Sequence, residues 1–194
     1  MTPAYARGAV LALLPTDFTA PTRAAWEGRR AQPRTETPVF LTAEAFATLR
    51  AAAARLVPAP DGIDPDVAGA LDRRLASGEG RGWRYDTLPA DGEAHSRGLT
   101  ALDASARAMF GTAFAAAEPA EQDTLLGAVQ HGAAAAWDGP DQRRWFELLL
   151  VDLTEFHVGH AAVQDAMGIA ASADAPGWTR IGLGEREPRE PASL

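Results

Sequence analysis

DQRRWFELLLVDLTEFHVGH, residues 141–160, is the stretch of sequence that decides the fold. Gly139-Pro140-Asp141 is typical of a helix start, and the apolar residues that follow fall on most sides of a helix. A helix that is apolar nearly all round lies in the middle of a bundle, and about 20 residues extend about 30 Å. The stretch therefore predicts an all-α protein assembled around one central helix.

Four further segments, towards the N-terminus, place apolar residues at helical spacing between capping residues, prolines and glycines. The predicted starts are Thr42, Asp64-Pro65-Asp66, Asp103 and Pro119, and the first two helices are predicted to end at Pro58 and Gly78. Residues 79–100 are predicted to be irregular, and no alternating pattern indicates a sheet. The predicted fold class is all-α, a compact helical bundle of about five main helices.

The bundle is predicted to span residues 41–164, between two regions of different composition. Residues 1–40 contain five prolines and are predicted to form an extended arm with one short helix over Thr22–Arg30. Thr22 is the predicted N-cap of that helix, and Trp26 is its predicted anchor against the bundle. Residues 165–194 are predicted to form an extended C-terminal tail.

Composition excludes several classes of protein. The chain has 194 residues, enough to bury a core, and it has no cysteine, which excludes disulfides and iron–sulfur clusters. The net charge is −8, and all 18 basic residues are arginines. Residues 1–40 carry a net charge of +2, and the remaining residues carry a net charge of −10. This acidic body argues against a nucleic-acid partner, which would need a basic surface. No stretch reaches the ~18 apolar residues of a membrane-spanning helix.

Two histidines form the best candidate for a metal site. His157 and His160 are three residues apart, so they would share one face of a helix, with Asp152 and Glu155 nearby. The metalloprotease pattern needs a glutamate after the first histidine, and this chain has Val158 there. The alternative is that these side chains pack near a helix C-terminus, where the helix dipole favours a protonated imidazole. We therefore predict that the chain has no metal ligands. His157 and His160 remain only as candidates for that role.

The other catalytic candidates are isolated. His95 and His131 have no partner in the sequence that would indicate acid–base catalysis. The run GEGRG, residues 78–82, lacks the strand and the lysine of a phosphate-binding loop, so we interpret it as a helix end and a surface loop. We predict no catalytic and no cofactor-binding residues in this chain.

The tryptophans and arginines near the two ends of the chain are the candidates for a protein interface. Trp and Arg are over-represented at such interfaces because of their large contact area and forked hydrogen-bond geometry. The predicted interface residues are Trp26, Arg29, Arg30, Trp178, Arg180, Arg186 and Arg189. The alternative for Trp178 is that it pins the tail to the chain's own bundle, and both roles can hold together.

Short patches in a fixed order make the chain resemble the gluconate 2-dehydrogenase subunit 3 family. They are FLTAEAFxxL (residues 40–49), RLVP (55–58), GLxxLDxxA (98–106), GxxF (111–114), QxxLL (122–126), WFELL (145–149) and GWxRIG (177–182). Each patch carries little information alone, and the resemblance depends on their order over residues 40–190.

The resemblance implies a helical, non-catalytic small subunit. In such complexes a large flavoprotein of the glucose-methanol-choline type holds FAD and oxidises a sugar, a sugar acid or, as in glucoside 3-dehydrogenases, a glycoside. In many of these complexes, electrons pass to a separate cytochrome c subunit that carries haem c. The small subunit is expected to stabilise, mature or export the large one, and to hold no cofactor itself.

The chain departs from the family pattern in two places. Many members carry a twin-arginine export signal, but Arg29-Arg30 is not followed by an apolar run, so location is left open between the cytoplasm and the periplasm. The Tyr-Gly-Gly-Asn element common before the tryptophan is absent from residues 165–176. Two other hypotheses stay open: a free-standing module with a closed pocket for a small apolar ligand, and a metal-dependent enzyme using His157 and His160.

Overall fold

A computed structural model describes residues 18–31, 33–60, 62–80, 82, 84–167, 182 and 184. Every regular element in these ranges is helical, with seven α-helices and one 3-10 turn, which confirms the all-α prediction. The chain divides into two compact units, residues 33–157 and residues 1–32 with 158–194. The predicted division into arm, bundle and tail remains a prediction.

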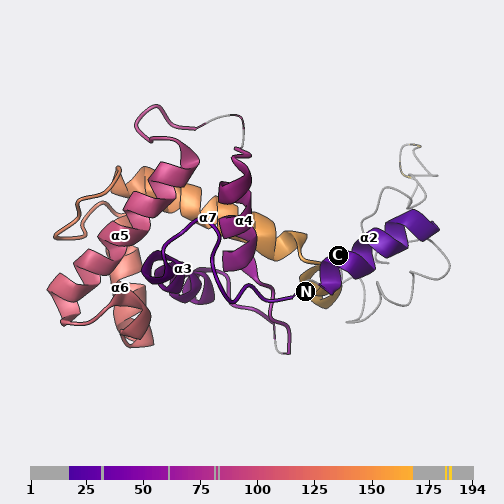
Figure 1. The fold of residues 1–194 in the computed structure, drawn as a ribbon, viewed down its shortest axis with the longest axis horizontal. Helices are drawn as coiled ribbons and strands as arrows, with labels where there is room; N and C mark the ends of the chain where they lie inside the picture. The colour runs from indigo at the N-terminus through magenta and orange to yellow at the C-terminus, as the bar shows by residue number, and fades with distance from the viewer. Residues whose placement is uncertain are drawn as a thin grey trace. The chain divides into compact units, whose positions relative to one another are not determined.

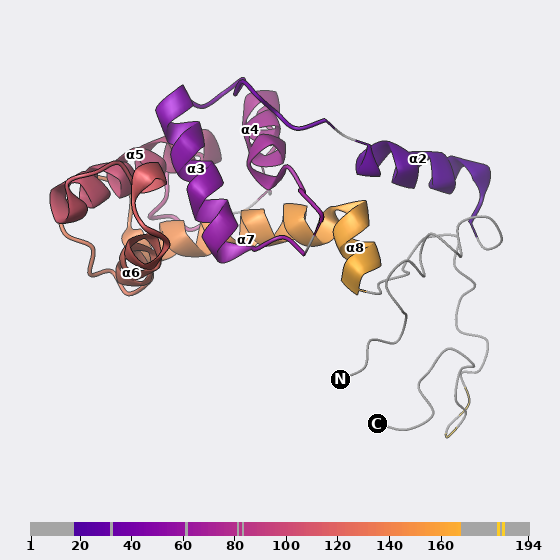
Figure 2. The same ribbon diagram turned by 90° about the horizontal axis from the view of Figure 1, so that it is seen from below.

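The unit of residues 33–157 contains the predicted bundle (Figure 1). Its elements are α3 (Ala43–Leu56), α4 (Val67–Ser77), α5 (Asp91–Phe110), the 3-10 turn η1 (Phe114–Ala116), α6 (Pro119–Gln130) and α7 (Gln142–Gly159), whose last two residues fall in the other unit. Helix α3 packs against α4, α5, α6 and η1, and in both views α7 extends alongside α3, α4 and α5 (Figures 1 and 2). The five predicted main helices are therefore present.

Capping residues explain why most of these helices begin where they do. The Thr42 hydroxyl accepts a hydrogen bond from the Ala45 amide at 3.2 Å, and the Asp141 carboxylate accepts one from the Arg144 amide at 2.9 Å. Pro119 lies in the first turn of α6, behind a reciprocal capping box. Helix α4 begins two residues later than predicted, because Asp66 and not Asp64 is the residue that caps it.

Helix α5 corrects the sequence prediction. It begins at Asp91 and not at Asp103, and it covers part of the region predicted to be irregular. Asp103 lies inside the helix, where its carboxylate accepts a hydrogen bond from the Phe114 amide at 2.8 Å and so holds the start of η1. The start of α5 escaped prediction because its N-cap, Ala90, has no side-chain oxygen to signal a cap.

The second correction concerns α7, which is not buried on all sides. Its inner face contributes Trp145, Phe146, Leu149 and Leu153 to the core, but Val151 is 48% exposed. The core is instead shared among α3, α4, α5, α6 and α7. None of the helices in the described ranges is both long enough and apolar enough to cross a membrane.

The described part of the other unit contains α2 (Ala20–Arg30) and α8 (Ala161–Met167), which pack against each other. The short helix predicted in the N-terminal arm is therefore present, but its predicted N-cap is wrong. Thr19 precedes the helix and Pro21 occupies its first turn, so Thr22 lies inside it. Trp26 is buried, and the Arg30 guanidinium lies 5.7 Å from the centre of its ring.

Candidate functional site

A groove opens between the end of α4 and the start of α5, with a volume of about 780 Å³. Leu75 and Gly78 form the α4 side, Leu88 and Asp91 the α5 side, and the loop between the two helices closes one wall. Gly78 has a φ of +72°, a backbone conformation that glycine adopts without strain, and it ends α4 there. The run 78–82 thus begins with a helix end, as interpreted from the sequence.

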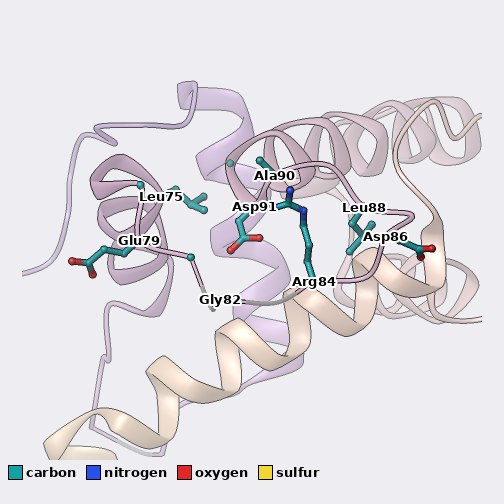
Figure 3. Close-up of a pocket in the computed structure, with 11 residues that line it drawn as sticks. Leu75, Glu79, Gly82, Arg84, Asp86, Leu88, Ala90 and Asp91 are labelled. Atoms are coloured by element: carbon teal, nitrogen blue, oxygen red, sulfur yellow. The ribbon is translucent and has the colours of Figure 1, made fainter.

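Charged side chains surround the groove unevenly. Figure 3 shows Asp91 and Arg84 near the middle of the groove, with Glu79 and Asp86 towards its two ends. The Oδ2 atom of Asp91 is shielded from solvent and has no hydrogen-bond partner among the described residues. An unpaired carboxylate oxygen in such a place favours a cation or a hydrogen-bond donor nearby.

An apolar ridge, Val39 and Phe40, lies beside the groove. Val39 is 67% exposed and Phe40 is 41% exposed, although both side chains are large and apolar. A Cβ atom added to Gly92 would lie 2.6 Å from Cζ of Phe40, so the ring packs closely against the first turn of α5. Gly92 also lines the groove, and the ridge and the groove therefore form one continuous surface.

A buried carboxylate fixes the backbone of the ridge. Asp72 of α4 has no exposed surface, and its two oxygens accept hydrogen bonds from the amides of Val39 (2.6 Å), Phe40 (3.2 Å) and Leu41 (2.8 Å). Hydrogen bonds to an ionised acceptor are stronger than neutral ones. The ridge is therefore held rigidly while its side chains point away from the core.

A second carboxylate, Asp66, holds the segment before the ridge. It accepts hydrogen bonds from the amide (2.8 Å) and the hydroxyl (2.6 Å) of Thr35, and from the amide of Gly69 (3.3 Å). Desolvation acts to raise the pKa of Asp66, but the hydrogen bonds from Thr35, Arg73 and Gly69 outweigh it and hold the pKa below its ordinary value. The ionised form of Asp66 thus stabilises the fold.

Three helices meet at a buried ionic cluster, Arg74, His95 and Asp152. The Oδ2 atom of Asp152 lies 2.7 Å from Nη2 of Arg74 and 2.7 Å from Nε2 of His95. His95 and Asp152 have no exposed surface, and the Arg74 guanidinium lies 5.4 Å from the centre of the Phe156 ring. No sequence pattern indicates this cluster, because consecutive members are 21 and 57 residues apart along the chain.

The cluster resembles the His–Asp pair of hydrolytic enzymes, but its surroundings indicate a structural role. A general base must lie within hydrogen-bond reach of the reacting group, and His95 is closed off from solvent in this structure. Ser105 lies ten residues further along α5, about 15 Å away, too far to complete a catalytic triad.

The other histidines lie at helix ends. His131 follows the last turn of α6, and its carbonyl accepts a hydrogen bond from Nε of Arg143 at 3.0 Å. His157 is half-buried in α7, and desolvation lowers the pKa of its imidazole. His160 lies beyond the end of α7, and its carbonyl accepts the first hydrogen bond of α8. The described ranges contain no group of three or more His, Cys, Asp or Glu side chains placed to hold a metal ion.

The predicted interface residues are placed only in part. Arg29 and Arg30 are exposed on α2, whereas Trp26 is buried. Trp178, Arg180, Arg186 and Arg189 lie outside the described residues. The roles of all seven in binding a partner remain predictions.

A second hollow, of about 210 Å³, lies between α3 and the start of α4, beside the exposed ion pair of Arg34 and Asp64. Like the groove, it is open to solvent. Neither of these two hollows has the enclosed shape that a small apolar ligand requires.

Comparison with known protein families gives one match. The model of the family described as gluconate 2-dehydrogenase subunit 3 matches residues 43–181, more than half of the chain. The matched region begins at the first residue of α3 and includes the cluster around Asp152 as well as the groove. No curated protein and no solved structure matches the chain.

Proposed function

The chain belongs to the gluconate 2-dehydrogenase subunit 3 family, and from this membership we propose that it is the non-catalytic small subunit of a dehydrogenase complex. In this proposal it binds and stabilises a large FAD-dependent subunit of the glucose-methanol-choline type, which oxidises a sugar, a sugar acid or a glycoside. The family match over residues 43–181 carries the proposal, because the family name describes a subunit of a gluconate dehydrogenase.

Two features of the described residues support a binding role over a catalytic one. The His95–Asp152 pair, which has the chemistry of a general base, is closed off from substrate. The surface instead presents a rigid apolar ridge beside a groove, which is the kind of surface that contacts proteins. From the family resemblance, the proposal places FAD in the large subunit and electron acceptance in a third, haem c-bearing subunit.

The physical role that follows is stabilisation by binding. A partner that binds the folded large subunit and not its unfolded chain raises the stability of the folded form by mass action. An obligate contact of this kind usually buries more than ~2,000 Å². The small subunit then contributes to activity by keeping the flavoprotein folded and loaded with its cofactor.

The test is co-expression of the large subunit with and without this chain. The large subunit is first identified as the protein that co-purifies with an affinity-tagged copy of this chain and shows flavin absorbance. Soluble yield, flavin content per polypeptide and dehydrogenase activity are then compared. We expect all three to fall in the absence of the small subunit.

Two results would contradict the proposal. One is a large subunit that is equally soluble, flavinated and active alone. The other is dehydrogenase activity in this chain purified by itself, which would place the reaction in the small subunit and not in the large one.

A further inference from the structure

The ridge has the features of an interface core. Val39 and Phe40 expose apolar surface, yet Asp72 fixes three consecutive amides beneath them. A rigid segment loses little conformational freedom when it binds, so more of its contact energy appears as affinity. An exposed apolar segment that is not held in this way would be expected to fold back onto the core.

Acidic side chains flank this apolar ridge. Glu36 and Glu44 are both exposed and lie three residues before and four residues after it in the chain. Asp91 directly precedes Gly92, against which the Phe40 ring packs. Two nearby arginines are paired with other acids, Arg34 with Asp64 at 2.6 Å and Arg73 with Asp66 at 3.3 Å, whereas Arg84 lines the groove together with Asp91. An apolar centre with a charged rim is the usual organisation of a protein interface.

The helix dipole is the alternative explanation for acids at the start of α5, and it accounts for only part of the pattern. Acidic residues are favoured in a first turn, which here contains Asp91 and Glu93. Glu93, however, also pairs with Arg97 at 3.1 Å, whereas the shielded Oδ2 atom of Asp91 has no hydrogen-bond partner among the described residues. Asp91 therefore makes no ion pair of this kind in the described structure, and it lies beside an open groove that Arg84 also lines.

We propose that the Val39–Phe40 ridge and the adjoining groove form the docking surface for the large subunit, with the ridge in an apolar pocket whose rim carries basic side chains that face Glu36 and Asp91. This inference rests on the proposed function. The acidic surplus of residues 33–157, with 19 acidic residues and 11 arginines, is the reason why a basic rim is proposed for the partner. The groove of about 780 Å³ receives a side chain of the partner beside Asp91.

The first test measures affinity for the large subunit, using the complex obtained by co-expression. Val39→Ser removes apolar contact area, and burial of a valine side chain is worth about tenfold in affinity. The double variant Glu36→Gln with Asp91→Asn should weaken binding by ~10-fold or more at low salt, and the remaining affinity should depend less on salt. The controls are Met109→Ser and Asp138→Asn. Met109 is an exposed apolar residue 18 positions along α5 from Asp91, and Asp138 is an exposed acid outside the groove.

The second test identifies the occupant of the surface directly. A photo-reactive phenylalanine analogue in place of Val39 should cross-link to the large subunit, and the same analogue in place of Met109 should not. Cross-links from position 39 to a second copy of this chain, or to its own tail, would overturn the inference. The Val39 side chain is largely exposed, so neither of its replacements should disturb folding, which circular dichroism checks.

The two proposals fail in different ways. If the unsubstituted chain binds the large subunit and the ridge and groove variants bind equally well, the docking surface is wrong and the proposed function stands. If the unsubstituted chain binds no flavoprotein at all, both are wrong.

Discussion

Gly98 is a residue at which α5 and α7 pack closely. A Cβ atom added there would lie 2.1 Å from Nε1 and Cε2 of Trp145, a buried side chain in the core. The absence of a side chain at residue 98 therefore lets the indole ring lie directly on the backbone of α5. Helix propensity alone would disfavour glycine in the middle of a helix by about 1 kcal/mol.

Gly98→Ala should destabilise the protein by ~2–3 kcal/mol, because either the Trp145 ring or α7 must move. The matched control is Gly127→Ala in α6, where no atom lies within 4 Å of the added Cβ. That substitution should be neutral or stabilise by up to about 1 kcal/mol through helix propensity. Urea denaturation measures both, and equal effects from the two substitutions would contradict the close contact.

Asp152 provides the second prediction at this scale. Asp152→Asn removes the charge that faces Arg74 and His95, and breaking a buried ion pair from one side costs ~3–5 kcal/mol. Unfolding free energy is compared with that of Asp138→Asn, an exposed acid that should change it by less than about 0.5 kcal/mol. A cost below about 1 kcal/mol for Asp152→Asn would show that the cluster does not hold the three helices together.

Among the elements, those with local signals could be predicted and those built by distant contacts could not. Thr42 caps α3, Pro119 occupies the first turn of α6 and Gly78 marks the end of α4, and each of these signals is local in the sequence. The start of α5 has no capping side chain, and glycine at residue 98 weakens the helical pattern for a reason that lies in α7. The sequence alone shows Gly98 but not its partner Trp145.

The candidate surface was missed for the same physical reason. Asp72 holds the ridge from about 30 residues away along the chain, and the groove is assembled from a helix end, a loop and a helix start. None of these three parts has a pattern that indicates a pocket. A useful signal was nevertheless present, since the adjacent apolar pair Val39–Phe40 precedes the predicted helix cap Thr42 and lies outside any predicted helix.

Asp66, which caps α4, makes the unfolding free energy of the protein depend on pH in the acid range. Its pKa is lowered in the folded protein, so its contribution is fully present above the ordinary carboxyl pKa and is lost as the pH falls through the lowered value. Asp66→Asn should therefore destabilise by ~1–2 kcal/mol at neutral pH, where the ionised acceptor is lost. From about pH 4 downward the difference between the two proteins should shrink towards zero.

Urea denaturation at a series of pH values follows this difference. Asp64→Asn is the control, since Asp64 is largely exposed and pairs only with Arg34 in the described structure, so the substitution should have little effect at any pH. A destabilisation by Asp66→Asn that stays constant from neutral to acid pH would mean that the Asp66 charge does not contribute.

For the whole molecule, the excess of acidic residues has opposite consequences for folding and for binding. The net charge is −8, and residues 33–157 account for all of it, with 19 acids and 11 arginines. Mutual repulsion of like charges weakens a compact state, and salt screens it. Exposed pairs such as Arg55–Asp123, at 2.6 Å, are screened as well, but each contributes little.

Raising sodium chloride from about 0.02 M to about 0.5 M should therefore stabilise the isolated chain, by ~0.5–1 kcal/mol at neutral pH. The complex with the large subunit should respond in the opposite sense, because its rim of unlike charges is screened over the same range. Urea denaturation measures the first effect and affinity measurement the second. If salt destabilises the isolated chain, its exposed ion pairs outweigh the repulsion. If salt strengthens the complex, apolar contact without charge complementarity is what holds the two subunits together.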